Sequence, residues 1–502
     1  MSERLSRWCL LPIQEHAAVN RTERIEILKH TADMRIVPLP IKVMRVKLAL
    51  RVTGIAVLCA IGLAAHAPAA GAAIPFPGCS WPVESTPTSA NVLYPDSNST
   101  YWTTPYRVKP GMQMYLRGRY PTARYFSIQA YDNNAQPYSV RGVASSLTDY
   151  QIRPSIGRNP WSAAAAVTAS LGRYEITLRS LSLRASTAVP GALRNTLPIA
   201  PASPTSGDLP ADIGFLMIRV YLPPQLNFSA VPLPSITIKA RGQAAVTLPR
   251  CGSRQGTRML GSSGLGKRIL KLVKGKSSAT PAPCPPGATG CPPNLQFFVP
   301  PSGNDIPFPN TTSGYAAAFF TPQAGKVVVI QAKVPTSPFD YHGGERPAPW
   351  PRNDRARWQV RYWSLCNYVY AKPFPVVVAP GPNGSTLYGC AADLQVPTTG
   401  QGNATVVLSY PDDRPSNATA ANGIAWLPMS TSDPTAVEQV SLRNMLISTT
   451  FKQSPKSATG NSVADAEQAL GAYYPHTAMC DVATFETGGA AACLDERTTG
   501  LG

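Results

Sequence analysis

The chain has 502 residues, more than one ordinary hydrophobic core holds, so at least two domains are expected. Only 15% of the residues are charged, whereas proline (52) and glycine (38) are frequent, which argues against a mainly helical protein. Lysine and arginine outnumber aspartate and glutamate by 46 to 27, giving a net charge of +19. Together with alternating apolar runs, this composition favours a turn-rich, all-β chain.

The N-terminal region has the order of a signal peptide. Three basic residues, Arg45, Lys47 and Arg51, precede an apolar run at 52–65, and small residues follow it. This order predicts an exported protein, secreted or held in the periplasm or cell envelope, with cleavage near Ala72 or Ala73. The apolar run is shorter than the roughly 20 residues that cross a bilayer, so no transmembrane anchor is expected after cleavage. Residues 1–33 form a candidate mis-annotated extension, with Met34 or Met44 as the start.

Cysteine usage agrees with export. Removal of the leader leaves eight cysteines, an even number that predicts disulfide bonds in an exported chain. We expect neighbours along the chain to pair, among about 105 possible connectivities. The expected pairs are Cys79–Cys251, Cys284–Cys291, Cys366–Cys390 and Cys480–Cys493. No metal site is expected, because Cys284 and Cys291 lie in a proline-rich loop without a nearby histidine.

A similar series of sequence motifs, typical of a β-domain, occurs in both halves of the chain. Tyr101 and Tyr315 each stand ten residues before a glycine that introduces a strand-like run. Further along, Arg-Tyr-aromatic-Ser occurs at 124–127 and again at 361–364, each time with a tyrosine four residues later. Several such matches in the same order predict an internal duplication. The expected fold is all-β, with two tandem antiparallel, jelly-roll-like β-sandwiches at 79–251 and 296–450 and a C-terminal helix and disulfide loop at 451–502.

The repeated arginine suggests a buried ion pair in each half. In a strand, alternate residues face opposite sides, which places Arg124 among apolar neighbours. A guanidinium there needs a carboxylate, and each half offers one at the start of a similar segment, Asp149-Tyr-Gln-Ile and Asp393-Leu-Gln-Val. We therefore expect Arg124 to pair with Asp149 and Arg361 with Asp393. A ligand-binding role for the arginines is the alternative.

The second half contains an aromatic-Ser pair, a tyrosine, Asn-x-x-x-Trp-Leu-Pro and a late arginine. These residues are Trp363-Ser364, Tyr368, Asn422-Gly-Ile-Ala-Trp426-Leu-Pro428 and Arg443. With them, about 150 residues of the second half resemble an exported bacterial domain of unknown function, and the first half resembles it more weakly. The resemblance implies an antiparallel β-sandwich and supplies no activity. The family's aspartate after the tyrosine is present as Asp132 but replaced by Val369 in the second half.

The segment 252–295 between the halves is basic and rich in proline. From Arg250 to Lys276 it holds eight Lys or Arg and no Asp or Glu. Apolar residues at helical spacing predict a short amphipathic helix, with cations mostly on its other side: Lys267, Arg268, Lys271 and Lys274. We expect attraction to an anionic lipid surface or envelope polymer, and no nucleic-acid partner outside the cell. The alternative is a solvated tether.

The sequence shows no catalytic motif. After the leader only His342 and His476 remain, without metal-binding spacing, and no nucleophile elbow occurs between a strand and a helix. The phosphate-loop-like GSSGLGK at 261–267 lacks the Ser or Thr that should follow the lysine, so no cofactor is expected. A ligand site is expected on the long insertion 336–358. Its candidate residues are Asp340, Tyr341, His342, Glu345, Arg346 and Trp350.

These observations favour a non-catalytic binding protein that is secreted or associated with the cell envelope. One alternative is a secreted hydrolase acting on glycan or lipid, with carboxylates near 336–358 and candidates Asp132, Asp149 and Asp340. Another is a structural component of the envelope. In the tail, residues 461–470 have the pattern of a capped helix that ends before Pro475.

Overall fold

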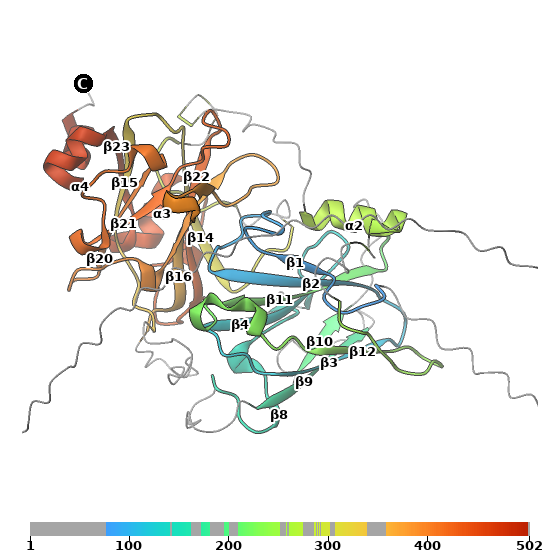
Figure 1. The fold of residues 1–502 in the computed structure, drawn as a ribbon. Helices are drawn as coiled ribbons and strands as arrows, with labels where there is room; N and C mark the ends of the chain where they lie inside the picture. Colours follow the sequence, from blue (N-terminus) through green and yellow to red (C-terminus); the bar gives the residue numbers. More distant parts are fainter. Residues whose placement is uncertain are drawn as a thin grey trace, which may run out of the picture. The chain divides into compact units, whose positions relative to one another are not determined.

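The computed structural model describes residues 77–140, 143–161, 172–180, 195–199, 209–251, 258, 261–274, 286–287, 289, 291, 293–301, 307–338 and 358–499. The predicted leader and cleavage site lie outside these residues. Residues 70–502 form one compact unit. The described part is mostly β, with antiparallel sheets and few helices (Figure 1). None of its helices is long and apolar enough to cross a lipid bilayer.

The first half builds one core between two sheets. One sheet has the order β1 (Val83–Ser85), β2 (Ser99–Arg107), β11 (Ile213–Tyr221), β4 (Tyr125–Tyr131) and β7 (Ser146–Thr148). The other has β10 (Thr196–Ile199), β9 (Arg173–Ser180), β3 (Gln113–Arg119), β12 (Ser235–Lys239) and β13 (Val246–Thr247), with β8 (Pro154–Ile156) beside β9. Alternate residues face inward, so Ile128 and Leu216 of the first sheet share a core with Leu116 and Ile176 of the second.

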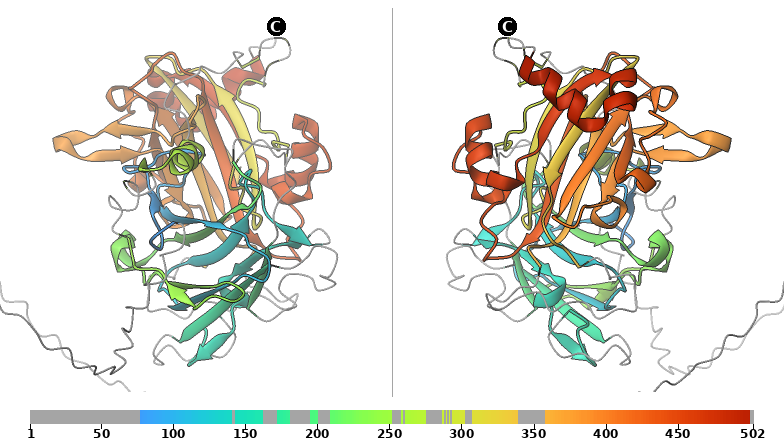
Figure 2. Two further views of the ribbon diagram at one scale, coloured as in Figure 1. Left: turned by 90° about the vertical axis from the view of Figure 1, so that its right-hand side faces the viewer. Right: turned by 90° about the vertical axis from the view of Figure 1, so that its left-hand side faces the viewer.

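The second half repeats this plan with four strands in each sheet. One sheet has the order β14 (Ser313–Phe320), β22 (Glu438–Ile447), β16 (Val360–Val369) and β19 (Cys390–Ala392). The other has β21 (Ile424–Pro428), β20 (Asn403–Ser409), β15 (Lys326–Lys333) and β23 (His476–Asp481). Trp363 and Leu442 meet Ile330 and Val406 in their shared core. Figure 2 shows the strands of the first half, blue to green, and of the second half, yellow to red, as separate groups.

The strand orders of the two halves correspond. The order β2, β11, β4, β7 matches β14, β22, β16, β19, and β10, β9, β3, β12 matches β21, β20, β15, β23. In each half a parallel pair lies at the same place, β10 with β9 and β21 with β20. Gly111 and Gly325 precede β3 and β15 with φ of 68° and 72°, a left-handed conformation that glycine adopts without a steric penalty.

The C-terminal tail contains more structure than the sequence predicts. The expected helix is present as α3 (Val463–Leu470), and its N-cap Ser462 accepts a hydrogen bond from the backbone of Asp465 at 3.1 Å. The tail also supplies β23, which pairs with β15, and α4 (Val482–Thr499). Phe485 of α4 is fully buried in a cluster with Val329 and Val407, so this helix covers the side of β15 and β20 that is turned away from the shared core.

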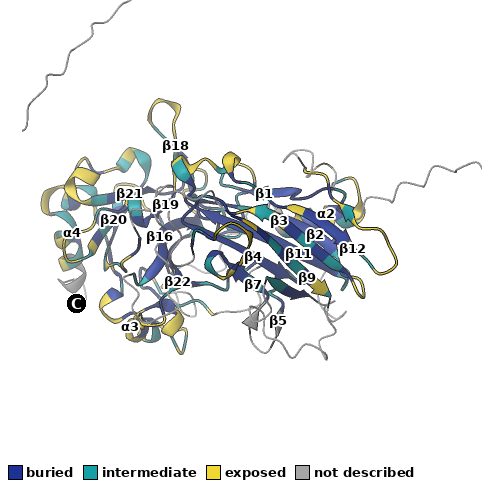
Figure 3. Cartoon of the chain, turned by 90° about the horizontal axis from the view of Figure 1, so that it is seen from below, coloured by how far each residue is buried: buried dark blue, intermediate teal, exposed yellow. Residues whose placement is uncertain are grey.

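Burial follows the layers of the fold. The central strands β4, β11, β16 and β22 are buried on both faces, as Figure 3 shows, because one face meets its own core and the other meets a different part of the chain. Two small hairpins add to this frame, β5 (Ser139–Val140) with β6 (Val143–Ala144) and β17 (Val378–Pro380) with β18 (Thr386–Tyr388). The outward faces of the central strands carry several buried polar groups, among them Arg219, Ser364 and Arg443.

Candidate functional site

Most of the insertion that the sequence favours as a ligand site, residues 339–357, lies outside the described part of the structure. Its six candidate residues, Asp340, Tyr341, His342, Glu345, Arg346 and Trp350, lie outside the described residues. The described part shows the base of the insertion, where Gln359 donates its backbone N–H to the carbonyl of Thr336 at 3.0 Å. Of the other carboxylates considered for catalysis, Asp132 accepts backbone hydrogen bonds from Asn134 and Gln136 at 2.9 Å and so stabilises a turn.

Two short segments cross between the halves. Residues 93–98, here the first strap, precede β2 and bond to β16 and β22 of the second half. Residues 308–312, here the second strap, precede β14 and bond to β4 and β11 of the first half. Each strap therefore covers the outward face of the central strands in the opposite half.

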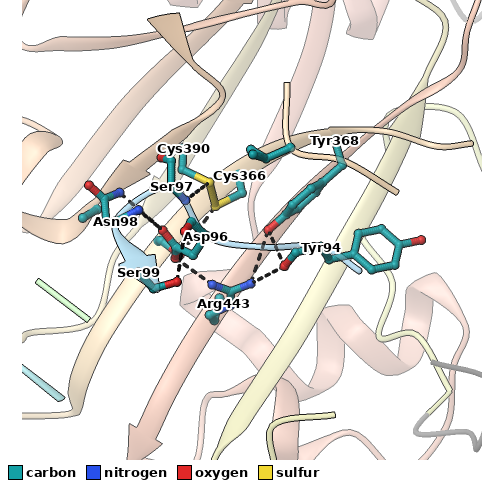
Figure 4. The surroundings of a disulfide bond; sticks show 12 residues. Tyr94, Asp96, Ser97, Asn98, Ser99, Cys366, Tyr368, Cys390 and Arg443 are labelled. Carbon is teal, nitrogen blue, oxygen red and sulfur yellow. Dashed lines mark hydrogen bonds and ion pairs between the residues drawn. A yellow bond between two sulfur atoms is a disulfide. The ribbon is translucent and has the colours of Figure 1, made fainter. Parts of the chain in front are cut away.

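The first strap places a buried carboxylate at the centre of a polar network (Figure 4). Asp96 is fully buried, and its Oδ2 accepts from the Tyr362 hydroxyl, the Ser364 hydroxyl and Arg443 Nη1, each at 2.7 Å. Arg443 Nη2 also donates to the carbonyl of Tyr94 at 3.1 Å. These charge-assisted hydrogen bonds join the two halves at a site closed to solvent.

The second strap mirrors the first without its charge pair. Arg219 on β11 donates Nη2 to the carbonyl of Phe308 at 2.7 Å, and the Tyr131 hydroxyl donates to the carbonyl of Pro309 at 3.0 Å. Asn310 stands five residues before Tyr315, as Asp96 stands five before Tyr101. Among the described residues Arg219 has no carboxylate partner, and its guanidinium lies 5.9 and 5.6 Å from the ring centroids of Tyr101 and Tyr131.

Sequence reasoning missed both straps, although a signal was present. Tyr94-Pro95-Asp96 and Phe308-Pro309-Asn310 are aromatic-Pro-Asx motifs at the same distance from the repeated tyrosines. The repeated Arg-Tyr-aromatic-Ser motif contributes to their docking surfaces, since Tyr362 and Ser364 bind the first strap and Tyr125 binds the second. The motif therefore serves the contact between the halves as well as each sheet.

The two predicted ion pairs have exchanged partners. Arg124 Nη1 lies 2.7 Å from Asp393 Oδ2, and Arg361 Nη1 lies 3.4 Å from Asp149 Oδ2. The expectation that each arginine pairs with the aspartate of its own half is therefore wrong. Arg361 Nη1 also donates to the backbone carbonyl of Arg124 at 3.2 Å, so the two pairs are adjacent.

The exchange is consistent with the hydrogen bonds that the aspartate makes within its own half. Asp149 accepts the backbone N–H of Phe126 at 3.1 Å and that of Tyr150 at 2.6 Å, so it anchors the strand of its own half through the backbone. Its charge is met by the arginine that arrives from the other half. All four side chains are almost fully buried, and burial raises the pKa of Asp149 to about 6 while Arg361 opposes that rise. Burial likewise raises the pKa of Asp393 against the effect of Arg124.

Three of the four expected disulfides are present: Cys79–Cys251, Cys366–Cys390 and Cys480–Cys493. Cys284 lies outside the described residues. The disulfides indicate an oxidising compartment outside the cytoplasm. Cys366 and Cys390 lie beside Asp96, and Ser97 donates its backbone N–H to Cys390 Sγ at 3.4 Å (Figure 4). Because the two sulfur atoms are bonded to each other, this group offers no thiolate to a metal.

A buried glutamate in β22 makes the free energy of unfolding depend on pH. Glu438 is fully buried and accepts hydrogen bonds from the backbone of Ser430 at 2.6 Å and from Asn367 Nδ2. Burial raises its pKa to about 8, above the ordinary value of 4.5, and these two donors only partly oppose the shift. The folded protein thus prefers the protonated carboxyl.

We expect Glu438→Gln to flatten the dependence of stability on pH. In the wild type, the contribution of Glu438 is fully present below pH 4.5 and is lost as the pH rises through about 8. The glutamine variant should therefore unfold at a higher temperature than the wild type at pH 9, and should gain little at pH 5. Thermal unfolding followed by circular dichroism measures this, with the exposed Glu467→Gln as the control. An equal loss of stability with pH in wild type and variant would contradict the assignment.

The predicted basic helix is present as α2 (Gly264–Lys274). Ile269 is fully buried against Phe215, Met217 and Phe308, so the apolar face of α2 packs on the first half (Figure 1). The Ser263 hydroxyl accepts the backbone N–H of Gly266 at 2.9 Å and caps the start of the helix. The cations Lys267, Arg268 and Lys271 are exposed. Lys274 is the last residue of α2, and the structure does not describe its side chain.

A small pocket in the second half reaches from the core to Lys333 at the surface, with a volume of about 20 Å³. Its lining is mostly apolar and includes Trp363, Leu365, Val406 and Leu442. A cavity of this size holds about one water molecule, so it cannot receive an organic ligand. The exposed basic side chains of α2 are therefore the better candidate for a binding surface.

No family model and no curated protein matches the chain. An uncharacterised protein from Burkholderia cenocepacia of known structure is similar to it, with a TM-score of 0.40 and 12% identity over 80% of this chain and 82% of that one. A protein from Vibrio parahaemolyticus has a TM-score of 0.32 and 8% identity over 73% of this chain and 88% of that one. Similarities this distant carry no argument about function.

Proposed function

We propose that the chain is an exported, non-catalytic binding protein that adheres to the cell envelope through electrostatic attraction. The proposal includes cleavage of the leader near Ala72 or Ala73, which mass spectrometry of the mature N-terminus would test. It also includes an origin of the two halves by duplication of one jelly-roll-like sandwich, within the domain family that the second half resembles. The matching strand orders and the corresponding glycine turns support that origin.

The observation that carries the proposed function is the packing of α2 against the rest of the protein. Its apolar face is buried against β11 and the second strap, which fixes the helix in place. Three exposed cations are thereby held on one side of a rigid element, in a linker segment that has no acidic residue. Because the apolar face is occupied, insertion into the hydrocarbon of a membrane would require α2 to leave its site. Adsorption to anionic lipid headgroups is therefore expected to be electrostatic.

We expect the full mature chain to adsorb to vesicles of phosphatidylglycerol and phosphatidylcholine, and to desorb as salt is raised. Replacing Lys267, Arg268, Lys271 and Lys274 with glutamine should weaken adsorption more than tenfold, because each cation near such a surface contributes about 1 kcal/mol. Co-sedimentation at several salt concentrations measures the effect. Pure phosphatidylcholine is the lipid control.

A matched variant separates a local site from net charge alone. Glutamine at four exposed cations elsewhere, Arg153, Arg241, Arg250 and Lys452, removes the same charge and should leave adsorption nearly unchanged. Equal losses in the two variants would reduce the effect to the overall charge of the protein. Undiminished adsorption after neutralisation of the helix would refute the proposed role of α2.

A further inference from the structure

A second basic surface lies on the first half, away from α2. Along β3 and β9, alternate residues such as Leu116 and Ile176 are buried in the core, so the residues between them face outward. The outward residues are Gln113, Tyr115, Arg117 and Arg119 on β3, and Arg173, Glu175, Thr177 and Arg179 on β9. Lys239 on β12 joins them beside Gln113. We call this surface the outer face.

The outer face is strongly cationic. Arg119 stands beside Arg173 at one end of the paired strands, and Gln113 stands between Arg179 and Lys239 at the other end. These four cations are exposed and have no carboxylate partner among the described residues. The one acid of this face, Glu175, is already bound by Arg117 at 2.6 Å. A face that served solubility alone would mix charges of both signs.

Between the two cationic ends runs a row of hydroxyl groups. Thr177, Tyr115 and Thr237 are directly opposite one another on neighbouring strands, and Thr247 continues the row on β13. The hydroxyls of Thr237 and Thr247 are 2.8 Å apart. The Arg117 guanidinium lies 5.4 Å from the ring centroid of Tyr115, which holds the ring within the row. Strands about 4.8 Å apart space these groups regularly across the sheet.

The second half shows that exposure here is not a general property of the fold. In that half the register places Val329 opposite Val407, at the positions that Tyr115 and Thr177 occupy in the first half. These valines are buried beneath α4. The same sheet position is therefore apolar and covered in one half, but polar, half-buried and flanked by cations in the other.

We propose that the outer face binds an extended chain of an acidic polysaccharide. Four of its five cations are arginines, whose planar guanidinium groups match carboxylates in a two-point hydrogen bond. The central row supplies the hydroxyls of Thr177 and Thr247 for sugar hydroxyls, and the Tyr115 ring for the apolar side of a sugar ring, whereas Thr237 is buried. Charges at both ends of the paired strands suit a ligand whose charges repeat along a chain. This surface is separate from α2, so the inference does not rest on the proposed function.

The test uses the full mature chain and polygalacturonate as the probe, with neutral dextran as the control polymer. Changing Arg119, Arg173 and Arg179 to threonine should raise the dissociation constant at least tenfold, since three exposed ion pairs with the ligand would be lost together. Threonine suits a strand, and unchanged thermal unfolding would show that the fold is intact. Tyr115→Ala should weaken binding without changing its dependence on salt.

The α2 variant with four glutamines is the matched control, and it should bind polygalacturonate as the wild type does. Conversely, the three-threonine variant should keep its adsorption to anionic vesicles. Polygalacturonate binding that survives the threonine changes would overturn the inference, as would equal binding to dextran. Double-stranded DNA bound as tightly, through the same arginines, would overturn it in favour of a surface for any polyanion.

Discussion

Asp393→Asn is expected to lower the free energy of unfolding by about 3–5 kcal/mol, because it leaves the buried guanidinium of Arg124 without a counter-ion. The two groups are 2.7 Å apart and fully buried, so solvent cannot replace the lost partner. The loss should be far larger than that of the exposed pair between Arg117 and Glu175, which serves as the control. Denaturant unfolding followed by tryptophan fluorescence measures both.

A double-mutant cycle decides the identity of the partner. Arg124→Met is combined once with Asp393→Asn and once with Asp149→Asn, and the interaction energy is taken from each cycle. We expect the larger coupling with Asp393, the aspartate of the opposite half. Stronger coupling with Asp149 would restore the pairing within one half and remove the exchange.

Removal of the Cys79–Cys251 disulfide is expected to destabilise the protein by about 5 kcal/mol, through the entropy that its loop gains on unfolding. This bond closes 172 residues, whereas Cys480–Cys493 closes 13. The same relation gives about 3 kcal/mol for the short loop. Paired alanine substitutions at each disulfide, unfolded in denaturant without reductant, give the two values. A greater loss from the short loop would show that local packing, not chain entropy, dominates.

The buried polar contacts between the halves affect whether the two halves unfold together or separately. Asp96, Asp149 and Asp393 each bring a charge from one half to an arginine of the other. Separation of the halves would break these contacts and expose the apolar cluster that they share, which includes Tyr221 of the first half and Tyr362 of the second. We therefore expect both halves to unfold in one transition, even though each has a core of its own.

Several elements are predictable from the sequence because their causes are local. The alternation in residues 124–131 gives the two faces of β4, and the spacing of leucine and isoleucine gives the helix α2. The cysteine order gives three of the disulfides, and the serine before the apolar pattern gives the start of α3. Strand β23 and the C-terminal helix α4 are not evident, because a short segment after a proline and an alanine-rich run carry weak periodicity.

The sequence by itself determined which residues face which side of a strand, because side-chain direction follows from the backbone period alone. It also determined that two arginines and two aspartates occur at equivalent places. Only the tertiary structure decided that each arginine meets the aspartate of the other half, and that Asp96 reaches Arg443. Equivalent positions offer the same partners in either half, so local pattern cannot choose between them. The choice is made where the two straps cross and the two halves pack.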